Sequence, residues 1–152
     1  MKILDATAGN RAIWFRKTYP DAIYLDARDG LNQNNTVGDC RHTTFAAGEF
    51  DLIVFDPPHM TVGPNSLMAE RYGHYLTHEI RELVRDAFAE FHRILKEDGL
   101  VAFKWSDHDT SIQKILEDVH GFDPLVGVPT AQRTEHSAVT YWCLLRRVEL
   151  PA

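Results

Sequence analysis

Short apolar runs alternate along the chain with segments of helical periodicity. The runs at 2–6, 22–27, 50–56 and 100–105 are nearly continuous in apolar residues, which is typical of strands buried on both faces of a parallel sheet. A longer run at 137–147 is rich in β-branched and aromatic residues, so it predicts an edge strand or an antiparallel closing strand.

Between these runs, apolar residues recur at the spacing of amphipathic helices. The clearest helix is predicted over 77–97, where Thr77 can cap the start and Gly99 can end it. A second helix is predicted over about 110–120, and a weaker one over about 10–18, directly after the first strand.

The alternation of strands and helices predicts the fold class. We expect one domain over residues 1–152, an α/β, Rossmann-like, doubly wound and mostly parallel sheet with a closing antiparallel strand. No apolar run approaches the ~20 residues that cross a bilayer, and the start, MKILDATAG, lacks the pattern of a signal peptide. Cys40 and Cys143 stand far apart and outside any C-x-x-C pair. These features favour a reduced, cytoplasmic protein without a membrane partner.

Acidic residues end three of the predicted strands. Asp5, Asp26 and Asp56 hold these positions, and Asp39 in VGDCR is expected near the same edge of the sheet. Any single one could simply cap a following helix, but four carboxylates on one rim repel one another. In such sheets ligands bind outside the carboxyl ends of the strands. An adenosine, with its ribose hydroxyls and amino group, would use several of these acceptors at once.

The first turn, DATAGN at 5–10, limits the kind of ligand. It has one glycine, Gly9, between small residues, and it is not G-x-G-x-x-G. The chain offers neither the phosphate-cradling glycines nor the lysine of a Walker motif. A nucleoside without phosphates therefore suits this turn better than a nucleotide.

The order of these motifs resembles class I S-adenosylmethionine (SAM) methyltransferases over nearly the whole chain. The most specific part, Asp56-Pro57-Pro58-His59, is similar to the D-P-P-Y/F/W motif of enzymes that methylate exocyclic amino groups in nucleic acids. Two departures stand out, because the glycine-rich loop is reduced and the aromatic position after the prolines holds His59.

This resemblance implies a set of SAM contacts. The methionine end would lie along the first turn, the ribose hydroxyls would donate to the acid after the second strand, and the adenine would face a third acid. The corner after the 50–56 strand would lie next to the sulfonium. In that order the residues are Asp5, Ala6, Thr7, Ala8 and Gly9; Asp26; Asp39 and Cys40; and Asp56, Pro57, Pro58 and His59.

The charge and the length of the chain favour one smaller family with a methyltransferase-like fold. With 16 basic against 22 acidic residues and a net charge of −6, the chain is a poor candidate for binding nucleic acid by phosphate neutralisation. We also expect no room for an added target-recognition domain. In these respects the chain is similar to the small bacteriophage SAM lyases, long called SAM hydrolases. That resemblance implies degradation of SAM to methylthioadenosine and homoserine lactone, an anti-restriction role in the host cytoplasm, and a homo-oligomer, commonly a trimer.

The lyase chemistry needs few parts. The sulfonium is a good leaving group, so the carboxylate of SAM can attack its own γ-carbon once the substrate is folded back. Glu70 is the candidate to grip the α-amino group, although beside Arg71 it could be a solvated charge. His59 and Tyr72 are candidate hydrogen-bonding partners. Lys104, between apolar neighbours in its strand, is expected to reach the rim.

Two other functions stay open. One is a small methyltransferase that acts on a nucleic-acid amino group or a small molecule, and the other is a SAM-binding subunit without catalytic activity. The histidines show no metal-ligand spacing, so no metal and no cofactor beyond SAM is expected.

Overall fold

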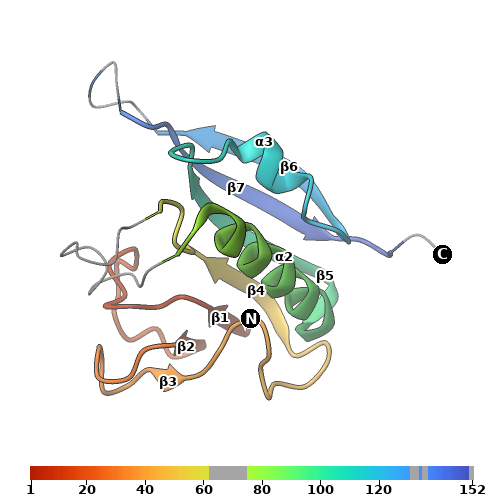
Figure 1. Ribbon diagram of the computed structural model, residues 1–152. Helices are drawn as coiled ribbons and strands as arrows, with labels where there is room; N and C mark the ends of the chain where they lie inside the picture. The colour runs from red at the N-terminus through yellow and green to blue at the C-terminus, as the bar shows by residue number, and fades with distance from the viewer. Residues whose placement is uncertain (62–74, 131–133, 135–136, 151–152) are drawn as a thin grey trace.

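One sheet organises the computed structural model, which describes residues 1–61, 75–130, 134 and 137–150. Within these residues seven strands hydrogen-bond in the order β3-β2-β1-β4-β5-β7-β6 (Figure 1). Pairing is parallel from β3 to β5, whereas β7 is antiparallel to both of its neighbours. The predicted α/β class, with a mostly parallel sheet and one antiparallel strand, is therefore confirmed. The strands are β1 Ile3–Asp5, β2 Ala22–Asp26, β3 Thr36–Val37, β4 Phe50–Phe55, β5 Leu95–Ser106, β6 Phe122–Pro129 and β7 Thr140–Arg147.

Two helices, α2 (Thr77–Ile94) and α3 (Ile112–Leu116), lie side by side on one face of the sheet (Figure 1). The apolar stripe of α2 is buried because its spacing keeps it against the sheet. Phe88 of α2 contacts Phe103 and Phe122 edge-on, with ring centroids 5.4 and 5.1 Å apart. No helix among the described residues is long and apolar enough to cross a membrane.

The end of α2 differs from the prediction. The helix stops at Ile94 rather than at 97, because Leu95 turns to an extended conformation and pairs with Phe50 of β4. Gly99 lies inside β5 and does not cap the helix. A Cβ atom at Gly99 would come within 2.7 Å of the Leu95 side chain, so this tight passage requires glycine.

The starts of both helices are held by side chains other than the one that the sequence analysis proposed. The Glu79 carboxylate, rather than Thr77, accepts the Leu76 backbone N–H at 2.6 Å. Ser111 caps α3 by accepting the Lys114 N–H at 3.3 Å. The predicted 110–120 helix is shorter because i→i−3 bonds tighten the chain after Leu116.

The predicted helix over 10–18 is absent, and turns occupy this segment. Arg11 has a left-handed backbone with φ +57°, which breaks helical geometry at once. Its guanidinium stacks on the Tyr24 ring at 3.7 Å and donates to the Lys17 carbonyl at 2.7 Å. Trp14 also contacts the Tyr24 ring, edge-on, with ring centroids 5.2 Å apart. The segment therefore covers β2 by side-chain contacts where the sequence predicted a helix.

The closing strand 137–147 corresponds to β7, which is antiparallel and lies inside the sheet. It is not an edge because β6 pairs with its outer side. The sequence analysis missed β6, since Pro124, Gly127 and Pro129 weaken its strand pattern. An edge strand tolerates proline, because one side of its backbone has no neighbour to bind.

Candidate functional site

Three acidic side chains meet at the carboxyl edge of the central strands. Asp5 is paired in register with Tyr24 of β2 and with Val54 of β4. Asp26 and Asp56 each lie two residues beyond those partners, so side-chain alternation puts all three acids on the same face of the sheet. The charges of Asp26 and Asp56 are close enough to act on the Asp5 carboxyl.

The loop after β1 is held between β2 and β4 by backbone hydrogen bonds. The Ala6 N–H donates to the Val54 carbonyl at 2.9 Å, and the Ala8 N–H donates to the Leu25 carbonyl at 2.8 Å. Thr7 reaches further along the same edge, because its Oγ1 accepts the backbone N–H of Asp56 at 2.8 Å. This loop and the D-P-P-H corner therefore form one connected structure.

Gly9 joins the same loop to the acid after β2. Its N–H donates to Asp26 Oδ2 at 2.7 Å, and its carbonyl accepts from Asn35 Nδ2 at 2.8 Å. The backbone of Gly9 is left-handed at φ +50°, a conformation that suits glycine. The small side chains of this loop therefore leave its backbone accessible at the carboxyl edge of the sheet. A ligand that binds there can come close to the main chain.

Asp26 is held ionised by its neighbours. Burial opposes its charge, but hydrogen bonds from Arg28 and from the Gly9 N–H outweigh burial and lower the pKa of the carboxyl. Arg28 Nε lies 3.0 Å from Asp26 Oδ1. An ionised carboxylate accepts hydrogen bonds and donates none, which suits a pair of hydroxyl donors such as those of a ribose.

Asp5 has no cationic partner among the described residues. Its side chain accepts the Trp14 indole N–H at 2.7 Å and the Thr7 backbone N–H at 3.2 Å. Burial raises the pKa of Asp5 to about 6, although these two hydrogen bonds oppose the shift. The three acids thus meet only two described cations, Arg28 and Lys104, and the edge keeps a surplus of negative charge.

Asp56, at the D-P-P-H corner, forms an ion pair with Lys104 of β5, with Nζ and Oδ2 2.8 Å apart. Asp56 Oδ1 makes no hydrogen bond with any residue that the structure describes. His59 turns back so that Nδ1 lies 3.2 Å from the Pro57 carbonyl oxygen, and its ring meets the Trp105 ring edge-on at 6.2 Å. Burial lowers the pKa of His59, so the ring is neutral near pH 7.

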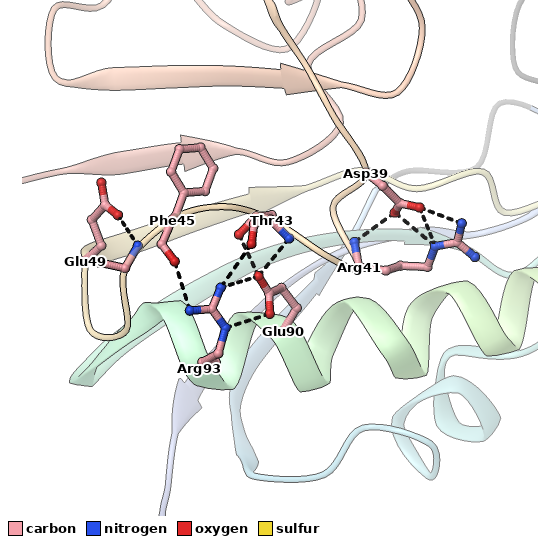
Figure 2. A network of polar contacts seen from close by, with 8 residues as sticks. Asp39, Arg41, Thr43, Phe45, Glu49, Glu90 and Arg93 are labelled. Atoms are coloured by element: carbon pink, nitrogen blue, oxygen red, sulfur yellow. Dashed lines mark hydrogen bonds and ion pairs between the residues drawn. The ribbon is translucent and has the colours of Figure 1, made fainter.

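The acid expected beside the adenine has a different environment. Asp39 is held by a two-pronged hydrogen bond to the Arg41 guanidinium, with Nη2 and Oδ2 2.6 Å apart (Figure 2). These bonds lower the pKa of Asp39. Cys40 is buried in the hydrophobic core. Burial raises the pKa of its thiol to about 12, so the side chain packs as an apolar group and does not act as a nucleophile.

The segment after Cys40 is fixed to α2 by a polar network. Glu90 accepts hydrogen bonds from the backbone N–H and the hydroxyl of Thr43, at 2.9 and 2.6 Å (Figure 2). Arg93 pairs with Glu90 and donates to the Phe45 carbonyl at 2.9 Å. This network explains how Asp39 and Cys40 are carried on a loop with a defined position.

Glu70 and Tyr72, the candidates for gripping the amino group of SAM, lie outside the described residues. Trp14 and Arg28 were missed by sequence analysis, because only the fold shows that they contact Asp5 and Asp26. Thr61 was missed as well, and it ties the chain after the D-P-P-H corner to Asp109, with Oγ1 and Oδ2 2.9 Å apart. No group of His, Cys, Asp and Glu that could hold a metal is found in the described part of the chain.

Known structures share this architecture. No protein-family model matches the sequence, and no curated protein matches it either. The PH0226 protein of Pyrococcus horikoshii superposes with a TM-score of 0.68 at 14% identity, over 96% of this chain and 81% of that one. A TehB-like SAM-dependent methyltransferase of Corynebacterium glutamicum gives a TM-score of 0.63 at 20% identity, over 96% and 79% of the two chains.

A third similar structure is that of a methyltransferase with two bound molecules. It is the 1,6-didemethyltoxoflavin-N1-methyltransferase of Burkholderia thailandensis with bound 1,6-didemethyltoxoflavin and S-adenosylhomocysteine. Its TM-score is 0.62 at 13% identity, over 97% of this chain and 71% of that one. These superpositions show that the chain shares the Rossmann-like fold of these structures. At identities this low they show the fold alone, and the reaction has to be argued from the site.

Proposed function

We propose that this protein binds SAM at the carboxyl edge of its sheet and transfers the methyl group to an amino group of a nucleic acid or a small molecule. The hydrogen bond from the Asp56 N–H to Thr7 Oγ1 carries this proposal. It joins the loop that would hold the methionine end of SAM to the D-P-P-H corner that would hold the acceptor. A donor and an acceptor must be held together in this way for a direct transfer.

The electrostatics of the edge support a cationic substrate. SAM carries a sulfonium and an α-ammonium against one carboxylate, so its net charge is positive. Asp5, Asp26 and Asp56 exceed the two described cations beside them, Arg28 and Lys104. A positively charged ligand at this edge would offset the remaining repulsion between the acids.

The corner also offers the groups that methyl transfer needs. The acceptor nitrogen attacks the methyl carbon, a C–N bond forms, and the C–S bond breaks with its electrons going to sulfur. Asp56 Oδ1 can accept an N–H of the acceptor and direct its lone pair toward the methyl group. His59 can take the departing proton on Nε2, because a carbonyl only accepts and the bond to Pro57 therefore puts the proton on Nδ1.

A SAM lyase is the second candidate, and the charge of the edge favours it. Arg28, Arg41 and Lys104 are each paired with an aspartate, so the described edge presents no basic surface for a polyanion. In this reaction the SAM carboxylate attacks the γ-carbon, a C–O bond forms, and the C–S bond breaks. Methylthioadenosine and homoserine lactone leave without any proton transfer. The anti-restriction role and the trimer belong to this candidate.

One incubation separates the candidates. The purified chain is mixed with SAM labelled in its methyl group, alone and with single-stranded oligonucleotides, nucleosides or a panel of small heteroaromatic amines. Methyl transfer gives S-adenosylhomocysteine and a labelled acceptor, only when the acceptor is present. Methylthioadenosine formed without any acceptor would replace the transferase by the lyase. SAM binding without either product, with every acceptor of the panel, would favour the non-catalytic SAM-binding subunit.

Two variants make the result specific to this edge. Asp26→Asn removes an acceptor proposed for the ribose and should weaken SAM binding. Asp51→Asn is the matched control, because Asp51 lies on β4 at the opposite end of the sheet, where it binds Lys96. A loss of SAM binding in the control as strong as that in Asp26→Asn would argue against a site at the carboxyl edge.

A further inference from the structure

Lys104 is a cation on an otherwise apolar part of β5. Side chains of this strand alternate, so that Val101, Phe103 and Trp105 are buried against the helices while Lys104 lies on the opposite face. That face of the strand also holds Leu100 and Ala102. The lysine therefore follows two apolar side chains on this face and lies two residues before the end of the strand, Ser106.

The strand register puts this lysine beside the D-P-P-H corner. Phe55 of β4 is paired in parallel with Phe103, so the next residues, Asp56 and Lys104, are neighbours on one face. Their side chains are only 22% and 25% exposed, and Nζ lies 2.8 Å from Oδ2. Water and salt screen the attraction between two such half-buried charges only weakly. The attraction therefore holds the two side chains in one geometry.

Stability alone does not account for the pair. Half-buried charges lose hydration, and replacing such a pair with apolar side chains is often neutral or stabilising. The chain already has a comparable pair elsewhere, since Lys96 of β5 binds Asp51 of β4 at 2.7 Å at the opposite end of the same two strands. That pair is more exposed, at 51% and 33%, and it lies far from the acidic edge.

We propose that Lys104 is a positioning residue that holds Asp56 Oδ2, so that Oδ1 is fixed for the N–H of the methyl acceptor. This inference rests on the proposed methyltransferase function. The Asp56 backbone is fixed by Thr7 Oγ1, and the lysine fixes the end of the side chain, so the carboxylate is restrained from both ends. Without the lysine, the carboxylate can rotate and sample positions that do not direct the acceptor nitrogen.

His59 provides a second readout of the same charge. Burial is the main cause of its lowered pKa; the Asp56 carboxylate and the Pro57 carbonyl oppose this effect, and the charges of Lys104 and His108 add to it. Removal of the lysine charge should therefore raise the pKa of His59. A lysine that only supported the fold at a distance would not alter this titration.

The test compares Lys104→Met, Lys104→Arg and the matched control Lys96→Met. We measure thermal unfolding, SAM affinity by calorimetry, kcat and KM with an acceptor identified as above, and the His59 titration by NMR. Lys104→Met leaves Asp56 without its cation, so it should lower the unfolding temperature and keep or strengthen SAM binding at a more negative edge. At saturating SAM it should still lower kcat about tenfold to hundredfold. It should also move the His59 titration to higher pH. Lys104→Arg should restore most of kcat, and Lys96→Met should match wild type.

Each result separates the inference from the function on which it rests. If the wild-type chain transfers no methyl group to any acceptor, the proposed function fails, and the role of Lys104 fails with it. If the wild type is active and Lys104→Met keeps its kcat, only the role of Lys104 is overturned. A fall in kcat that Lys96→Met reproduces, or that leaves the His59 titration unchanged, would also overturn it.

Discussion

The backbone N–H of Asp56 donates to Thr7 Oγ1 at 2.8 Å, across 49 residues of sequence. Two motifs that the chain keeps apart, the loop after β1 and the D-P-P-H corner after β4, are thereby joined. β1 and β4 are adjacent and parallel, so their carboxyl ends open at the same edge. The bond sets the position of Asp56 relative to the loop, on which the proposed transfer depends.

Thr7→Val tests this bond. The substitution keeps the shape of the side chain and removes the oxygen, so the partly buried Asp56 N–H loses its acceptor. We expect a cost of about 1–3 kcal/mol in unfolding free energy, measured by chemical denaturation. Turnover of SAM should fall more than this cost explains, because the corner moves relative to the loop. Thr7→Ser, which keeps the hydroxyl, should retain both properties, and equal effects of Val and Ser would contradict the role of the oxygen.

Asp26→Asn tests the proposed ribose contact. The amide replaces a charged acceptor that binds the Gly9 N–H and Arg28, and it weakens any hydrogen bond from a hydroxyl donor. We expect SAM affinity to fall roughly tenfold to hundredfold, as for a lost hydrogen bond to a charged group. Isothermal calorimetry measures it. Asp29→Asn, an exposed neighbour, should bind SAM like wild type. Wild-type affinity in Asp26→Asn would remove Asp26 from the site.

Asp5 predicts a specific pH dependence of stability. The folded chain holds the Asp5 proton up to about pH 6, whereas an unfolded chain releases it near 3.8. The folded state therefore binds more protons between these values, and the contribution of Asp5 to stability falls as the pH rises through this window. Asp5→Asn lacks this titration. Its unfolding free energy relative to wild type should rise by up to about 3 kcal/mol between pH 3.5 and pH 7.

Denaturant unfolding of both proteins across this pH range measures the difference. Asp29→Asn serves as the control, because it removes an exposed carboxyl and leaves Asp5 in place. A constant difference between Asp5→Asn and wild type at every pH would show that Asp5 titrates alike in the folded and unfolded chains. That result would contradict the raised pKa of the buried Asp5 carboxyl.

A substitution at His59 tests whether this side chain accepts a proton or only supplies an aromatic ring to the D-P-P-H corner. If Nε2 takes the proton, methyl transfer needs the neutral ring, and the rate should fall only below the ordinary pKa of 6.5, because burial lowers the pKa of His59. His59→Phe restores the aromatic ring found in the D-P-P-F form of the motif and removes the base. We expect kcat to fall on the order of a hundredfold. A Phe variant with wild-type kcat would assign the histidine to shape alone.

The lowered pKa of His59 also makes the free energy of unfolding depend on pH. A histidine whose pKa is lowered on folding binds fewer protons when folded, so its contribution is complete above pH 6.5 and is lost as the pH falls below that value. His59→Phe should therefore lose less stability than wild type between pH 7 and pH 5. Thermal unfolding at these two pH values checks this prediction, and equal losses would contradict it.

The sequence by itself determined the features that depend on local pattern. Nearly continuous apolar runs predicted β1, β2, β4 and β5, and the apolar stripe of α2 predicted its helix, because burial imposes these periodicities. The acids at the ends of the predicted strands also put Asp5, Asp26 and Asp56 at one edge of the sheet. Their convergence follows from parallel pairing, which puts the carboxyl ends of adjacent strands at one edge.

Only the tertiary structure decided features that depend on distant partners. β6 is a strand because β7 pairs with it, despite two prolines. Residues 10–18 form turns in which Arg11 and Trp14 both pack on Tyr24. The ion pair between Lys104 and Asp56 depends on the register of β4 against β5. No pattern within either segment encodes that register. It is set by how apolar side chains of separate segments fill the core, which is a property of the folded chain as a whole.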